Sequence, residues 1–456
     1  MDDNTATIVY HAFTMCVYFS PIFTGIIADS WFGKFKIIIY LIFINLFGNL
    51  AVFGSSFPVF NLNDSKIITL FGLLMISIGF GGTKPCIAAF GGDQFQLPEQ
   101  EQHLTQYFSL YYFTMNCGSL IAKLVAPNCR EDIHCFGEDN CYPAVFGGFT
   151  AFVIFSFAFF VLGYAYYIIK KPTENLFVEV TSCIKHACVR KRQSKKKEQR
   201  DHWLDYADDQ YDIKFIENVK IVLRILVLYI PLTVFAALFD QQGSRWTLQA
   251  THMNGEIFNG YFTIKPDQMQ VANPIMVFML IPIYDKIIYP LCAKINVLTD
   301  PLKRIFFGGL LASIAFVVSG LLQLAIERNF LMEGNVEVKS VNMLWQLPQY
   351  LLMSTAEVMF SVTGLQFSYS QAPSSMKSVL QACWLLRIGF GNLLVIIITG
   401  INIMDSQANE FFFFAILLTT TMFIFLYLAH NYKKDQTTKC STNDEITEKR
   451  NCDIKV

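Results

Sequence analysis

Long apolar runs separated by short polar connections recur along the whole chain. Each run is close to the length of about 20 residues that an α-helix needs to cross the hydrocarbon core of a bilayer. The eleven runs cover residues 7–28, 37–57, 67–90, 105–126, 143–169, 216–240, 267–292, 302–326, 342–369, 376–403 and 409–431. The pattern predicts an all-α polytopic membrane protein with about 11 transmembrane helices.

A long polar stretch divides these runs into five and six. It contains seven basic residues between Arg190 and Arg200. We therefore expect an incomplete N-terminal bundle of five spans, a cytosolic basic linker, a C-terminal bundle of six spans and a disordered cytosolic tail. In residue numbers these are 1–170, 171–214, 215–432 and 433–456.

Composition supports a membrane protein and excludes several other classes. Only 16 % of the residues are charged and 53 % are hydrophobic, whereas soluble domains carry about 25 % charged residues. The net charge of −1 gives no electrostatic support for binding to nucleic acid. The sequence shows no nucleophile–base spacing, metal-ligand cluster or phosphate loop, so we expect no enzyme, metal site or cofactor.

The placement of Lys and Arg predicts the orientation in the membrane. Basic residues gather in alternate connections, which we assign to the cytoplasm together with the C-terminus. The sequon at Asn63 then lies outside, as does a loop where we expect Cys135 to pair with Cys141 and leave Cys129 free. The odd number of spans puts Met1 outside without a signal region, which a missing preceding helix would explain.

Two ionisable residues are placed to meet inside the membrane. Arg224 lies roughly 12 Å, and Asp285 roughly 10 Å, from the cytoplasmic ends of consecutive antiparallel helices. A buried charge without a partner is costly, so a pair is expected. The pair is either a static structural contact or one that breaks during a transport cycle, and the sequence leaves both readings open.

Glu357 and Arg387 are predicted near the middle of the membrane. A carboxylate at that depth is either protonated or paired with a cation. Arg387 shares a helix face with Trp384 and should face the bundle interior. Glu357 is at comparable depth, so we expect it to be the partner of Arg387.

Three further ionisable residues have both a functional and a structural reading. Lys84, beside Pro85, either serves a site or reaches toward the interface. Asp240 lies at an outer helix end, where it can be solvated. His11 either exchanges protons or is a hydrogen-bonded packing residue.

Five ordered stretches of the chain resemble the proton-coupled oligopeptide transporter family, near the animal di- and tripeptide symporters. They are GIIADSWFGK at 25–34, GTKPCIAAFGGDQF at 82–95, FSLYYFTMNCGSL at 108–120, ALFDQQGSRWTLQA at 237–250 and SVTGLQFSYSQAP at 361–373. The resemblance implies a major-facilitator-like two-bundle architecture with a central cavity. It also implies uptake of small peptides with protons by a monomer in the plasma membrane, driven by the proton gradient and without a cofactor.

The resemblance also implies roles for individual residues. The positions that match proton coupling are His11, Arg224, Asp240 and Asp285. The positions that match substrate binding are Tyr10, Tyr18, Lys84, Asn116, Asn273, Tyr350, Glu357 and Trp384. Among these, Lys84 would lie near the peptide carboxylate, and Glu357 would bind the peptide amino group.

The chain departs from the family pattern at four points. The first family helix, with its Glu-x-x-Glu-Arg motif, has no counterpart, and only residues 327–341 occupy the place of a large extracellular domain. Ala236 replaces a cavity Trp, and Arg387 replaces a small or neutral residue. These departures leave an alternative, a non-transporting regulatory or structural membrane partner in which Arg387 neutralises Glu357. A transporter of another solute, such as nitrate or histidine, is a third reading.

Overall fold

The computed structural model describes most of the chain. It covers residues 2–453 apart from 60, 97–98, 138–139, 170–175, 194–199, 201, 258–261, 295–297, 299, 329–330, 334–335, 339, 372, 374–375, 402–403 and 405. Within these residues the protein is helical, except for two short antiparallel hairpins. The hairpins are β1 (Glu256–Ile257) with β2 (Phe262–Thr263), and β3 (Leu331–Glu333) with β4 (Val336–Val338).

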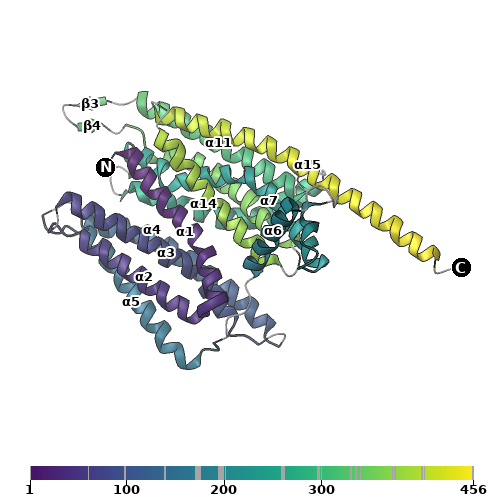
Figure 1. The fold of residues 1–456 in the computed structure, drawn as a ribbon. Coiled ribbons are helices and arrows are strands. Elements are labelled where there is room, and N and C mark those ends of the chain that lie inside the picture. Colours follow the sequence, from purple (N-terminus) through teal and green to yellow (C-terminus); the bar gives the residue numbers. More distant parts are fainter. Residues whose placement is uncertain are drawn as a thin grey trace.

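One group of helices contains the first five predicted spans (Figure 1). Its elements are α1 (Asp3–Ile27), the π-helical turn η1 (Ala28–Phe32), α2 (Lys34–Ser55), α3 (Leu62–Gly92), α4 (Glu101–Asp132), α5 (Tyr142–Leu162) and η2 (Gly163–Tyr166). Helices α2 and α3 approach each other closely at Gly79. A Cβ added to Gly79 would lie only 2.6 Å from the Asn45 backbone nitrogen, so a larger residue would not fit there. Small residues such as the glycines within Gly79–Gly82 allow this close packing of two helices.

The second group contains the later spans and surrounds a larger core. Its elements are α7 (Ile213–Asp240), η4 (Gln241–Gly243), α8 (Arg245–Thr251), η5 (Pro266–Val271), α9 (Ala272–Ile283), η6 (Tyr284–Ile288), α10 (Tyr289–Lys294), α11 (Pro301–Arg328), η7 (Met343–Gln346), α12 (Leu347–Glu357), η8 (Val358–Val362), α13 (Thr363–Gln371), α14 (Lys377–Ile401) and α15 (Gln407–Asp453). Trp246, Tyr350 and Phe316 are fully buried in this core. The first group has a smaller apolar core of its own, which includes Ile38, Leu41 and Phe90.

Within the described residues each predicted apolar run is mostly helical, and nine helices there are long and apolar enough to cross a membrane. The other two runs differ for physical reasons. Helix α4 is rich in polar residues. The run 342–369 is divided among α12, the π-helical turn η8 and α13. These observations support a multi-pass helical membrane protein.

The polar linker contains more structure than a charged connection requires. Helix α6 (Leu176–Gln193) packs beside the short helix η3 (Trp203–Ala207), and Val180 and Cys183 join the second core. The imidazole of His202 caps η3 by accepting a hydrogen bond from the Leu204 amide at 3.2 Å. Burial lowers the pKa of His202, and the positive charge of Lys220 lowers it further. Burial raises the pKa of Asp205, but the hydrogen bond and positive charge of Lys220, together with the hydrogen bond from the His202 backbone, outweigh it, so the pKa is lowered overall.

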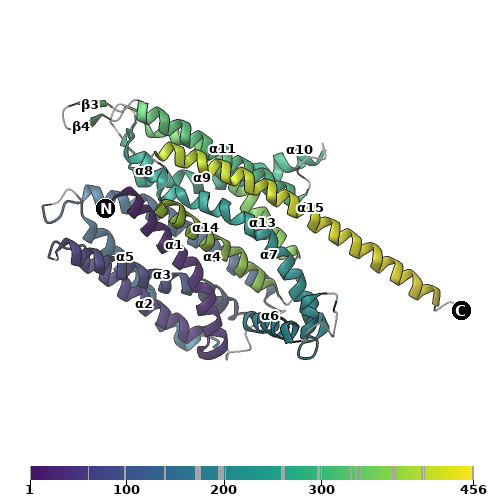
Figure 2. The same cartoon turned by 45° about the horizontal axis from the view of Figure 1, so that its top comes forward.

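The prediction of a disordered tail is wrong for residues 433–453, which continue α15 (Figure 1). Residues 407–453 contain neither Gly nor Pro, so the sequence supplies no helix stop after the membrane span. Helix α1 of the first group packs against α14 of the second (Figure 2). This contact brings the ionisable residues of the two groups together.

Candidate functional site

A buried hydrogen-bonded chain joins the two helix groups through His11. The His11 side chain is completely buried, and its Nδ1 lies 2.6 Å from Oδ1 of Asn392 in α14. Its Nε2 lies 2.9 Å from the Ser244 hydroxyl, between η4 and α8. The Asn392 amide nitrogen in turn donates to the Asp240 carboxylate at 2.5 Å. Because an amide oxygen can only accept, His11 Nδ1 donates, and the neutral imidazole accepts from Ser244 through Nε2.

Asn392 and Ser244 are the residues that sequence reasoning missed at this point. Asn392 is completely buried within a run of apolar residues. A buried amide needs partners for its donor and acceptor groups, so an isolated Asn in a membrane span is a usable signal. His11 and Asp240, which were expected from sequence, are brought together only through this amide.

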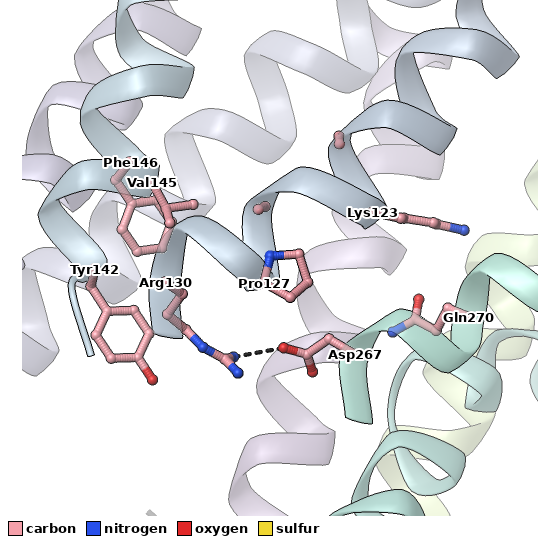
Figure 3. A pocket seen from close by; sticks show the side chains of 10 residues that line it. Lys123, Pro127, Arg130, Tyr142, Val145, Phe146, Asp267 and Gln270 are labelled. Carbon is pink, nitrogen blue, oxygen red and sulfur yellow. Dashed lines mark hydrogen bonds and ion pairs between the residues drawn. The ribbon is translucent and has the colours of Figure 1, made fainter. Parts of the chain in front are cut away.

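A second contact between the groups lies at the end of α4. Arg130 Nη1 lies 2.6 Å from Asp267 Oδ2 in η5, and Figure 3 shows the two side chains facing each other. Lys265 extends this contact, because its Nζ lies 2.7 Å from Asp132 Oδ1. A cavity of about 350 Å³ adjoins the Arg130–Asp267 pair, and Lys123 is among the residues that line it. These ion pairs hold the two groups together on the side predicted to face outward.

A buried ion pair makes a third contact at the same end. The Arg245 guanidinium contacts the Glu410 carboxylate at 2.8 and 3.1 Å, and each side chain is only 7 % exposed. Arg245 also donates from Nη2 to Asn4 at the start of α1, at 2.8 Å. One arginine therefore connects α8, α15 and α1.

Glu357 lies at the end of α12, immediately before η8, and is half-buried. It accepts a hydrogen bond from the Asn273 amide at 3.1 Å. Lys123 and Asp240 both interact with it electrostatically. Lys123 thus lies in the electrostatic field of the carboxylate that was expected to bind the peptide amino group.

Lys84 faces aromatic rings in the first group. Its Nζ lies 4.4 Å from the centre of the Phe80 ring and 5.6 Å from that of Tyr18. No ion pair found among the described residues includes Lys84. Tyr18 is close enough to Asp240 and Arg387 to interact with both electrostatically. Tyr18 therefore stands between Lys84 and the charged residues of the second group.

The remaining predicted residues lie on several different helices. Tyr10 contacts the His11 ring edge-to-face at 5.1 Å, and Asn116 is half-buried in α4. Tyr350 is completely buried against Trp246, with a centroid distance of 4.9 Å. Arg224 is half-buried in α7, but the side chain of Asp285 lies outside the described residues, so their pairing stays a prediction.

The structure does not give Arg387 the partner that we expected. Its guanidinium carbon lies 4.0 Å from the centre of the Trp384 ring and 5.3 Å from that of Phe360. Asp240, not Glu357, is the carboxylate with which it interacts electrostatically. In the described structure Arg387 and Glu357 form no ion pair, because Glu357 points to Asn273 and Arg387 stacks on the aromatic rings.

Two expectations about the cysteines near the end of α4 agree with the structure. A disulfide joins Cys135 to Cys141, and Cys129 is a free thiol. Asn63 is exposed in the first turn of α3, so the asparagine of the sequon is accessible to solvent. Glycosylation at Asn63 remains a prediction.

Comparison with known proteins identifies the family. The POT family profile matches residues 35–411 of this chain. The chain belongs to the POT family. "Peptide transporter family 1" of Drosophila melanogaster is 31 % identical, with 98 % of this chain and 85 % of the relative covered. "Solute carrier family 15 member 1" of Homo sapiens is 30 % identical, with coverages of 99 % and 91 %.

Solved structures show the same fold. The crystal structure of the POT family transporter PepTSo has a TM-score of 0.79 at 27 % identity, covering 95 % of this chain and 90 % of that chain. The structure of an auto-inhibited POT family peptide transporter has a TM-score of 0.76 at 25 % identity, covering 94 % and 88 %. The fold class predicted from the sequence, an all-α two-bundle transporter, is therefore confirmed.

Proposed function

We propose that this POT family member is a proton-coupled symporter of di- and tripeptides that works by alternating access. The observation that carries the proposal is the match to peptide transporters over nearly the whole chain. The buried chain from His11 through Asn392 to Asp240 supports it, because these ionisable groups lie where the two helix groups meet. The alternative of a non-transporting partner receives no support from these relatives.

Proton uptake at His11 supplies the coupling step. In the neutral imidazole Nε2 accepts a hydrogen from Ser244, and after protonation it can only donate. The Ser244 hydroxyl must then turn and act as acceptor, which changes the contact between α1 and the start of α8. A proton can thus bias the equilibrium between two arrangements of the bundles, because it binds them with different affinity.

One charged residue from each helix group binds one end of the peptide. In this proposal Glu357 pairs with the peptide amino group, assisted by Asn273, and Lys84 pairs with the terminal carboxylate. The arrangement uses the two charges that every free peptide carries. The Arg130–Asp267 and Lys265–Asp132 pairs close the outer side in this conformation and open when the bundles rock apart.

We also propose an oligomeric state, a membrane and an orientation for the protein. We place it as a monomer in the plasma membrane with a cytoplasmic C-terminus, on the basis of the alternating distribution of Lys and Arg. Arg224 and Asp285 form a pair that changes during the cycle. The proton gradient is the driving force, and the proposal requires no metal or other cofactor.

Uptake of a labelled dipeptide tests the proposal. Cells expressing the full chain should accumulate labelled Ala-Gln faster at an outside pH of about 5.5 than at about 7.5, because protonated His11 would be more populated. His11→Gln should abolish this acid stimulation. His430→Gln is the matched control, because His430 is exposed on α15, far along the sequence from the bundle contact. Uptake that is indifferent to pH would refute proton coupling, and no uptake above untransfected cells would refute peptide transport.

A further inference from the structure

Arg387 is a buried cation with hydrogen-bond donors that are not used. Its side chain is only 5 % exposed. Its Nε and Nη1 are both buried, and neither has an acceptor in the described structure. A guanidinium has five N–H donors and stays charged in proteins. Leaving such donors unpaired away from water costs more than a typical hydrogen bond contributes.

The aromatic stacking leaves the edge of the guanidinium available. The Arg387 guanidinium lies over the rings of Trp384 and Phe360, at 4.0 and 5.3 Å from their centres. This type of contact stabilises the positive charge but provides no hydrogen-bond acceptor in place of a carboxylate for the N–H donors. The planar fork of an arginine matches the two oxygens of a carboxylate. The stacked, pre-oriented fork of Arg387 is therefore suited to bind an acid.

Among the described residues, the two candidate acids, Asp240 and Glu357, already have other partners. Asp240 accepts from Asn392 at 2.5 Å, and Glu357 accepts from Asn273 at 3.1 Å. Asp240 interacts with Arg387 at longer range, and no ion pair joins these two described residues. An acceptor for the fork must therefore come either from a rearrangement or from a ligand.

The position of Arg387 connects it with the residues expected to bind the peptide. Phe360, over which it lies, follows Glu357 by three residues in η8. Tyr18 interacts electrostatically with Arg387 and lies under Lys84. Two cations thus flank Tyr18, and only one of them is needed for the terminal carboxylate of a peptide.

We propose that Arg387 binds the side-chain carboxylate of the transported peptide, so that the transporter prefers peptides containing Asp or Glu. This inference rests on the proposed peptide transport. The charges support it: Lys84, Lys123 and Arg387 contribute three positive charges, and Asp240 and Glu357 contribute two negative ones. The set carries a net charge of +1 when all five groups are ionised, which favours a substrate with one extra negative charge.

The test compares Ala-Glu with Ala-Gln, which have nearly the same shape and differ in one charge. Competition against labelled Ala-Gln uptake gives the ratio of the two apparent affinities at one outside pH. The full-length protein should favour Ala-Glu by about tenfold or more, since hydrogen bonds to charged groups are among the strongest in proteins. Arg387→Gln should bring the ratio to about one, and Arg387→Lys should give an intermediate ratio, because Lys keeps the charge and loses the fork.

Arg304→Gln is the matched control. Arg304 also stacks on an aromatic ring, with its guanidinium carbon 4.0 Å from the centre of Tyr289, but its Nε donates to the Leu298 carbonyl at 2.6 Å. This variant should keep the wild-type ratio. Ala-Glu with an amidated C-terminus should retain the preference over amidated Ala-Gln, which separates the side-chain carboxylate from the terminal one.

The outcomes separate the inference from the proposed function. If the wild-type protein transports Ala-Gln but binds Ala-Glu no more tightly, the inference is wrong even when Arg387→Gln does not fold. If Arg387→Gln weakens both peptides equally, Arg387 serves the terminal carboxylate or the fold, and the inference is again wrong. If the wild-type protein transports neither peptide, the proposed function itself fails.

Discussion

Breaking the Arg245–Glu410 pair should destabilise the protein strongly. Both side chains are 7 % exposed, and the guanidinium makes two contacts with the carboxylate, at 2.8 and 3.1 Å. At 2.8 Å and an effective dielectric constant of about 20, the Coulomb attraction is at most about 6 kcal/mol. Part of it is offset by the loss of hydration when the charges are buried. Removing one partner of such a pair typically costs about 3–5 kcal/mol, because the other charge stays buried alone.

We therefore expect Glu410→Gln to lower the free energy of unfolding by about 3 kcal/mol. The double variant Arg245→Met with Glu410→Leu removes both charges and should cost only about 1 kcal/mol, which is the value of the lost hydrogen bond to Asn4. Unfolding can be followed by Trp fluorescence during SDS titration in mixed micelles. Glu327→Gln, at the end of α11, is a control with little expected change.

Two results would refute this reasoning. A change below about 1 kcal/mol in Glu410→Gln would show that the pair is hydrated or mobile rather than buried. A double variant as unstable as the single one would show that packing, and not an uncompensated charge, explains the loss. Either result would also weaken the argument that Arg245 fastens α1 to the second helix group.

Three further predictions concern the outer rim and the linker. Arg130→Gln should increase labelling of cysteines introduced at the predicted outer ends of α4 and α9, because the partly exposed Arg130–Asp267 pair contributes about 1 kcal/mol to the closed state. The charge swap Arg130→Asp with Asp267→Arg should restore the wild-type labelling. Unchanged labelling in Arg130→Gln would show that the pair does not stabilise the closed state. Cys135→Ser should lower the free energy of unfolding by about 2 kcal/mol, since the disulfide closes a short loop in the unfolded chain. The reduced wild-type protein should then be as unstable as the variant. Cys129→Ser should leave stability unchanged, because Cys129 is a free thiol. The lowered pKa of His202 means that its contribution to η3 is present above its unfolded pKa of about 6.5 and is lost as pH falls through the lower folded pKa. The protection factors of the amides in 202–207, which compare measured exchange with the intrinsic rate at each pH, should therefore fall as pH is lowered from about 7.5 through the folded pKa. His202→Asn should cap η3 without this pH dependence.

The sequence determined the membrane character, the helix pattern and most of the candidate residues of this protein. Backbone is tolerated in a bilayer only where its hydrogen bonds are satisfied, so long apolar runs favour helices. In the described residues each predicted run is mostly helical. The cost of burying charge made His11, Glu357 and Arg387 recognisable one by one. Residues 407–453 contain neither Gly nor Pro, which is a sequence signal for a helix that continues past the membrane span.

Only the tertiary structure decided which of these groups meet. Depth along a helix gives one coordinate, whereas a hydrogen bond also depends on the rotation of each helix and on which helices are neighbours. Thus Glu357 and Arg387, at similar depth, are not partners: Glu357 receives the Asn273 amide, and Arg387 lies on Trp384. For the same reason the sequence could not show that Asn392 joins His11 to Asp240, because the residues are 381 and 152 positions apart from Asn392 in the chain.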